Sequence, residues 1–129
     1  MVIDPIISAY IFCSFTVVVA IFQLALALGA PWGEIAMGGK FPGRFPPQMR
    51  IAALVQMLVH LLIALVVLIR AGLVFGEYLE FSKSAIWFIV VLYVIGTLLN
   101  IITPSKNERI LWAPVTVVLL ICSYVVANS

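Results

Sequence analysis

The sequence predicts a single all-α domain, an antiparallel bundle of four transmembrane helices that uses the whole chain. The first reason is composition: 65% of the 129 residues are hydrophobic and only 9% are charged, whereas a soluble domain carries about 25% charged residues. The second reason is spacing. Charged residues leave four charge-free stretches, 5–33, 51–69, 84–105 and 110–129, and each reaches or approaches the roughly 17 to 25 residues that a helix needs to cross a bilayer.

The first predicted helix covers about residues 5–29. Asp4 is a favoured N-cap residue and Pro5 is favoured at the first helical position. Gly29, followed by Ala and Pro, supplies a stop. No Lys or Arg precedes the apolar run, which is also longer than the apolar region of a signal peptide. We therefore expect a retained helix.

The other predicted helices cover about residues 48–72, 84–103 and 106–127. Gly72 ends the first of these three. Ser105 and Glu108 have the spacing of a capping box, so the last helix should begin at the membrane surface. Pro114 lies inside that helix, where it should either kink it or separate a surface turn from the spanning part.

Basic residues predict the orientation in a cell membrane. The side with the first and third loops holds five of the seven, whereas the second loop holds two, Arg70 and Lys83. Loops rich in Lys and Arg stay in the cytoplasm, so both termini should face outward. The five are Lys40, Arg44, Arg50, Lys106 and Arg109.

Each of the first three helices carries one polar stripe. Thr16 and Gln23 of the first helix are seven residues apart, Gln56 and His60 are four apart, and Tyr93 and Asn100 are seven apart. A polar group that faces lipid costs several kcal/mol, so these stripes should face each other. The sequence predicts that five of these residues line an intrabundle cavity and contact a ligand there: Gln23, Gln56, His60, Tyr93 and Asn100.

His60 and Tyr93 lie near the middle of neighbouring helices, which predicts that they meet. We expect a neutral His60 that accepts a hydrogen bond from the Tyr93 hydroxyl and donates one to Gln23 or to a ligand. Interhelical hydrogen bonding alone also accounts for the polar stripes, because such bonds contribute about 0.6 kcal/mol on average in a membrane protein where they were measured.

The first loop, "APWGEIAMGGKFPGRFPPQMR", is long for so small a protein, and long loops are usually functional or mobile. Its first half predicts a short helical turn that either lies in the membrane interface or folds back over the polar cluster as a cap. Trp32, Glu34, Arg50 and Arg109 are the expected rim residues, with Glu34 close enough to the two arginines for an ion pair.

Several classes of function are not expected. One His cannot complete a metal site, no spacing supports a catalytic nucleophile and its base, and no cofactor is indicated, so we do not expect an enzyme. A net charge of +2 is too small for nucleic-acid binding. The first helix has no carboxylate for proton-coupled antiport. Cys13 and Cys122 lie at different depths, so we expect no disulfide.

The segments "GAPWGE", the following "GG" and "ERILWAPV" resemble those of small, uncharacterised bacterial integral membrane proteins with four predicted helices. The resemblance covers the whole chain and implies a bacterial inner-membrane setting. It implies no activity.

Two functions remain open. The protein either binds or transports a lipid-like or small amphiphilic ligand in the cavity, or acts by helix association with itself or with a larger membrane complex. Ala25 and Gly29 have the small-xxx-small spacing that allows close helix contact. Membrane lipid is the expected surrounding partner in both cases.

Overall fold

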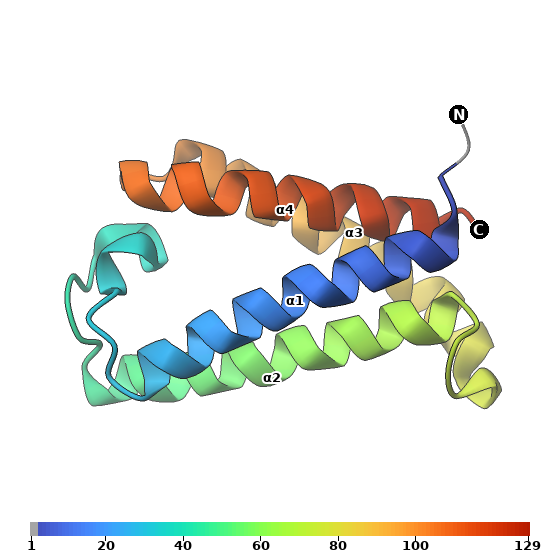
Figure 1. Ribbon diagram of the computed structural model, residues 1–129, viewed down its shortest axis with the longest axis horizontal. Helices are drawn as coiled ribbons and strands as arrows, with labels where there is room; N and C mark the ends of the chain where they lie inside the picture. Colours follow the sequence, from blue (N-terminus) through green and yellow to red (C-terminus); the bar gives the residue numbers. More distant parts are fainter. Residues whose placement is uncertain (1–2) are drawn as a thin grey trace.

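The computed structural model describes residues 3–129 and consists of four long helices joined by one long loop and two short connections. Each helix is long and apolar enough to cross a membrane, and neighbouring helices run antiparallel (Figure 1). The predicted fold class is therefore confirmed. The helices are α1 (Pro5–Ala27), α2 (Pro47–Arg70), α3 (Leu79–Ile102) and α4 (Lys106–Ala127).

The bundle has two distinct ends (Figure 1). The terminal end holds the start of α1, the end of α4 and residues 71–78; the loop end holds residues 28–46, called loop 1, and the turn at residues 103–105. Helix α1 packs against α2 and α4, and α3 packs mainly against α4. Helices α2 and α3 make fewer contacts with each other, although a short connection joins them.

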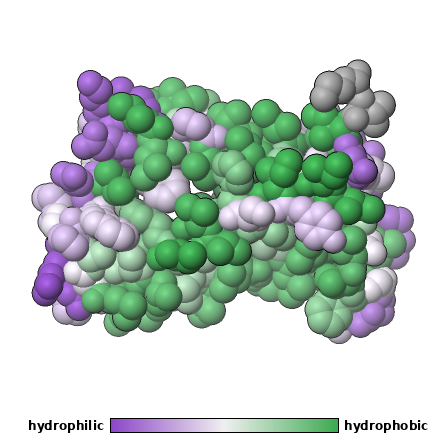
Figure 2. All heavy atoms as spheres, in the orientation of Figure 1, coloured by the Kyte–Doolittle hydropathy of each residue, from purple (hydrophilic) through white to green (hydrophobic). Residues whose placement is uncertain are grey.

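Hydrophobic residues cover the middle of the molecule, and hydrophilic residues gather at both ends (Figure 2). Large apolar side chains near the middle of the helices, such as Val18, Leu58 and Phe88, are exposed. Lipid, unlike water, solvates such a surface at no cost. With four candidate spans, the chain is a multi-pass integral membrane protein.

The helix ends follow the predicted capping residues. The Asp4 carboxylate accepts a hydrogen bond from the Ile6 N–H (2.8 Å), and the Ser105 hydroxyl oxygen accepts one from the Glu108 N–H (3.3 Å). Helix α4 runs unbroken through Pro114, with no separate surface turn.

Helix α3 begins at Leu79 rather than at residue 84. Its first turns are polar: Glu80 and Lys83 form an exposed ion pair at 2.9 Å. The charge-free stretch therefore marked only the apolar part of this helix. The ends of α1 and α2, Ala27 and Arg70, lie two residues before the predicted ends at 29 and 72.

The small-xxx-small pair of α1 does not form a helix face. Gly29 lies beyond Ala27, the last residue of α1, and its φ of +99° is not helical. A Cβ at Gly29 would meet the guanidinium of Arg50 at 3.1 Å, so this side chain covers the position. Ala25 and Gly29 therefore do not form the helical face that their spacing predicted.

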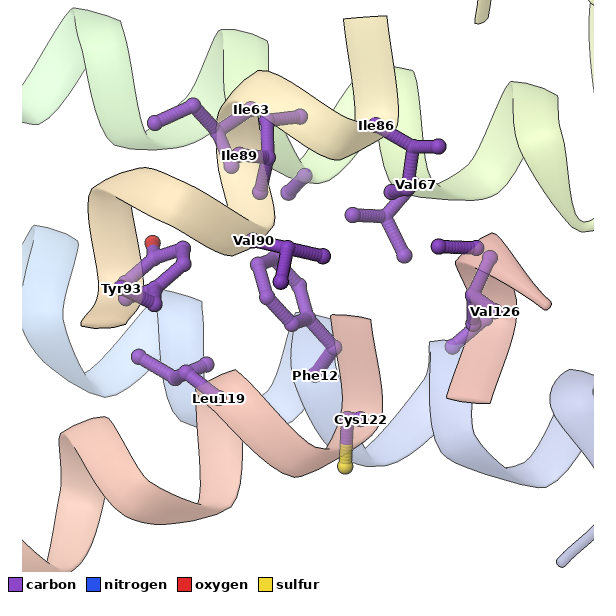
Figure 3. Packing of buried hydrophobic residues seen from close by; sticks show 13 residues of the cluster. Phe12, Ile63, Val67, Ile86, Ile89, Val90, Tyr93, Leu119, Cys122 and Val126 are labelled. Carbon is purple, nitrogen blue, oxygen red and sulfur yellow. The ribbon is translucent and has the colours of Figure 1, made fainter. Parts of the chain in front are cut away.

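Buried hydrophobic residues form two clusters. The larger one lies toward the terminal end, where Tyr93 packs edge-on against Phe12 with ring centroids 5.6 Å apart (Figure 3). The smaller one, at the loop end, contains Phe22, Leu26 and Phe45. Cys13 and Cys122 are both free thiols in the structure.

Candidate binding pocket

A pocket of about 380 Å³ lies between the two clusters, lined by residues of all four helices and of loop 1. Its size falls within the roughly 300 to 1,000 Å³ of small-molecule sites. Most lining side chains are apolar. The polar ones are Gln23, Gln56, His60, Tyr93, Asn100, Glu108 and Thr116.

All five residues predicted to contact a ligand line this pocket. The helical periodicity of the polar stripes thus identified the faces that the structure brings together. Their contact with a ligand stays a prediction. The five are Gln23, Gln56, His60, Tyr93 and Asn100.

Only one pair of these side chains is hydrogen-bonded across a helix interface. The Gln23 amide donates to the Gln56 side-chain oxygen at 2.9 Å, linking α1 to α2. On α3, the Thr97 hydroxyl donates to the Tyr93 carbonyl (2.7 Å) and the Asn100 amide donates to the Gly96 carbonyl (3.0 Å), both within the helix. Interhelical hydrogen bonding therefore explains the glutamines but not the polar face of α3.

The predicted hydrogen bond between His60 and Tyr93 is wrong. Within residues 3–129, His60 Nδ1 and Tyr93 Oη are both buried without a hydrogen-bond partner. The Tyr93 ring packs against Phe12 in the terminal-end cluster, and α2 and α3 are loosely packed where the pocket lies between them. The expected bond from His60 to Gln23 is also absent from these residues, where the Gln23 side-chain NH2 group donates to Gln56.

Loop 1 folds back toward α4 at the loop end of the bundle (Figure 1), and several of its residues line the pocket. Three hydrogen bonds hold it to α4 and its N-cap. Ile35, Ala36 and Met37 line the pocket at its loop end. Of the two arrangements that the sequence left open, an interfacial turn and a folded-back cap, this geometry is that of the cap. The bonds join the Trp112 indole N–H to the Ile35 carbonyl (2.9 Å), the Ser105 hydroxyl to the Glu34 carbonyl (2.7 Å), and the Gly38 N–H to Glu108 Oε2 (3.1 Å).

Glycines make this tight loop path possible. Residues 37–39 all have positive φ, at +52°, +69° and +76°, and such a turn gathers backbone N–H groups that bind an anionic oxygen. The Glu108 carboxyl group occupies that position at Gly38. Earlier in the loop, a Cβ on Gly33 would lie only 1.8 Å from the Phe41 carbonyl oxygen. No other residue fits there without a backbone shift.

Trp32, predicted at the rim, is half exposed and stacks on Phe22 with ring centroids 6.3 Å apart. Phe22 also contacts Trp112, and the centroids of these two rings are 4.7 Å apart. Phe22 and Trp112 line the pocket, and Trp32 does not.

The predicted ion pair of Glu34 with the arginines is wrong. Among residues 3–129, the only ion pair is that of Glu80 on α3. The two arginines instead donate hydrogen bonds to backbone carbonyl groups in the turns. Arg50 donates to the Phe45 carbonyl (3.0 Å), and Arg109 donates to that of Thr103 (2.7 Å).

Glu108 is the site residue that the sequence did not indicate. We expected it to complete a capping box at the surface, but its side chain is only 6% exposed and lines the pocket. The spacing of Glu108, Trp112, Val115 and Leu119 follows one helical face, and all four line the pocket. That periodicity was the available signal.

The described residues contain no group of three or more His, Cys, Asp or Glu that could hold a metal ion. No protein-family model, curated protein or solved structure matches this chain. The function is therefore argued from the pocket itself.

Proposed function

We propose that this protein binds a small amphiphilic molecule from the membrane in the pocket between the two clusters. The observation that carries the proposal is a pair of buried side-chain atoms, His60 Nδ1 and Tyr93 Oη, that have no hydrogen-bond partner among residues 3–129 and that belong to two residues lining the pocket. A buried polar group left without a hydrogen bond costs about 1 to 3 kcal/mol. A ligand with a hydroxyl, amide or amine group would supply the missing bonds.

The remaining lining favours an amphiphile over a polar solute. Apolar side chains such as Val19, Ile63 and Leu119 form most of the wall, so an apolar segment of the ligand would replace lipid contacts there. Mostly apolar pockets with a few convergent polar groups are the usual form of small-molecule sites.

The ligand would enter sideways from the bilayer. Val59 of α2 and Leu92 of α3 both line the pocket and are 46% and 47% exposed, so the pocket reaches the lipid-facing surface between these helices. Met37 of loop 1 is also exposed and marks a second approach at the loop end. No catalytic step is proposed, because binding alone accounts for the arrangement.

Orientation and setting are part of the proposal. We infer that the loop end faces the cytoplasm of a bacterial inner membrane and that both termini face outward. The excess of Lys and Arg at the loop end supports this orientation, and the resemblance of "GAPWGE" and "ERILWAPV" supports the setting.

Native mass spectrometry of gently extracted protein tests the proposal, with Gly96→Phe as the blocking variant. Gly96 lines the pocket, and a Cβ added there meets nothing within 4 Å, so the backbone has room for a side chain at this position. Leu98→Phe is the matched control on the same helix, because Leu98 is exposed and does not line the pocket.

We expect a co-purifying small molecule in the natural protein and in Leu98→Phe, and its loss in Gly96→Phe. A bound molecule that persists in Gly96→Phe, or no bound molecule in any sample, would contradict the proposal. The same spectra give the subunit count. A defined oligomer without a bound molecule would instead favour the alternative, in which the protein associates with itself or with a larger membrane complex.

A further inference from the structure

The pocket lining carries an acidic side chain and no basic Lys or Arg. Glu108 is the only Asp, Glu, Lys or Arg among the residues that line the pocket, and it is 6% exposed. No Lys, Arg or His nitrogen lies within 4.0 Å of its carboxyl group in the described part of the chain. Its neighbours on the first turn of α4, Lys106 and Arg109, are exposed, and Arg109 is bonded to the Thr103 carbonyl.

The Glu108 carboxyl group has unused hydrogen-bonding capacity. Oε2 accepts from the Gly38 N–H at 3.1 Å, and this is the one hydrogen bond that the side chain makes among residues 3–129. A carboxylate has about four lone-pair positions on two oxygens. A buried ionised carboxylate is costly unless it is paired and fully hydrogen-bonded, so the site favours an occupant that brings a positive charge and N–H donors.

The aromatic residues beside Glu108 also favour a positively charged ligand. Trp112 lies one helical turn further along α4, and its ring is 4.7 Å from that of Phe22; both line the pocket. Cations are attracted to the faces of such rings. An anionic head group, in contrast, would meet Glu108 with no basic lining residue to balance it, which excludes it by repulsion.

We propose that the ligand is a lipophilic amine, with its ammonium group beside Glu108 and the rings of Phe22 and Trp112, and its apolar part toward the opening between α2 and α3. This inference rests on the proposed function and adds the chemical class of the ligand. The amine is a cation at neutral pH, and its N–H groups donate hydrogen bonds to the unoccupied lone-pair positions of the Glu108 carboxyl oxygens.

The test compares three probes with one chain length: octylamine, octanol and octanoate. Each is titrated at neutral pH into the full-length protein in nanodiscs of zwitterionic lipid, and heat measured with empty nanodiscs is subtracted to remove partition into lipid. A hydrogen bond to a charged group is about twice as strong as a neutral one, so we expect octylamine to bind about tenfold more tightly than octanol, and octanoate most weakly.

Glu108→Gln is the decisive variant, because it removes the charge and keeps an oxygen that accepts from Gly38. We expect the ratio of octylamine to octanol affinity to fall to about one, with octanol binding unchanged, which also shows that the pocket is intact. Glu34→Gln is the matched control: Glu34 is an exposed carboxylate of loop 1 whose side chain does not line the pocket, and its ratio should stay as in the natural protein.

The outcomes separate the two proposals. Octanol and octylamine of equal affinity, octanoate the tightest, or an unchanged ratio in Glu108→Gln would overturn the amine inference and leave the binding function standing. If none of the three probes binds, or if binding persists in Gly96→Phe, the proposed function is overturned and the amine inference with it.

Discussion

Replacing Gly33 by Ala should detach loop 1 while the four helices remain. The added Cβ would lie 1.8 Å from the Phe41 carbonyl oxygen and 2.8 Å from that of Gly43, and both are backbone atoms that cannot rotate away. The backbone must therefore move. That movement breaks the hydrogen bond from the Gly33 N–H to the Gly43 carbonyl, which is 2.9 Å long.

The size of the effect follows from the contacts that hold loop 1. Besides the bond at Gly33, three hydrogen bonds join the loop to α4 and its N-cap, one of them to a carboxyl group. Neutral hydrogen bonds contribute about 0.5 to 1.5 kcal/mol each and bonds to charged groups about 1.5 to 3, so full release of the loop, which breaks three neutral bonds and one to a carboxyl group, costs roughly 3 to 7.5 kcal/mol. Once the loop is free, the helices should lose no further stability.

Hydrogen-exchange mass spectrometry measures this release. We expect faster exchange across residues 33–40 in Gly33→Ala and unchanged exchange in the helix centres. Gly76→Ala is the matched control, because a Cβ there meets nothing within 4 Å and its φ is not positive. Equal protection of residues 33–40 in Gly33→Ala and in the natural protein would refute the described loop path and the cap built on it.

Three other perturbations address the interhelical hydrogen bond, the open space on α3 and the orientation. A double-mutant cycle of Gln23→Leu and Gln56→Leu should give a coupling free energy of about 0.5 to 1 kcal/mol, and zero coupling would contradict the bond. Gly96→Ala should raise the free energy of unfolding by about 0.5 to 1 kcal/mol, measured by denaturant titration. With both native thiols removed, Lys40→Cys should be labelled from the cytoplasmic side and Asn128→Cys from outside; the reverse pattern would overturn the orientation.

Most of the fold could be predicted because the bilayer constrains it. Charge-free stretches have to span, and residues such as Asp4 and Ser105 cap helices by local chemistry that needs no knowledge of the tertiary structure. The start of α3 was missed for the same reason. Glu80 and Lys83 lie in a helical extension beyond the apolar part, where length and hydropathy give no signal.

The site was only partly predictable, because sequence gives depth and helix face but not the distance between helices. His60 and Tyr93 both line one pocket, as predicted, yet their buried polar atoms have no hydrogen-bond partner among the described residues. Glu34 was assigned to an ion pair on charge alone. Arg50 and Arg109 instead donate to the backbone carbonyl groups of Phe45 and Thr103, which come within reach only once the turns have formed.

Glu108 connects the cap to the pocket, and this double role explains its burial. A capping residue on a membrane surface is normally solvated, but Glu108 turns inward because the Gly38 N–H binds Oε2 there. The bond leaves the second carboxyl oxygen for the pocket, so loop closure and occupation by an amine need not compete for the same atom. Met37, at a φ of +52°, is a non-glycine residue in the left-handed region, a backbone strain that persists only where the surroundings support it. At this turn, the support is the same carboxyl group that would bind the ligand.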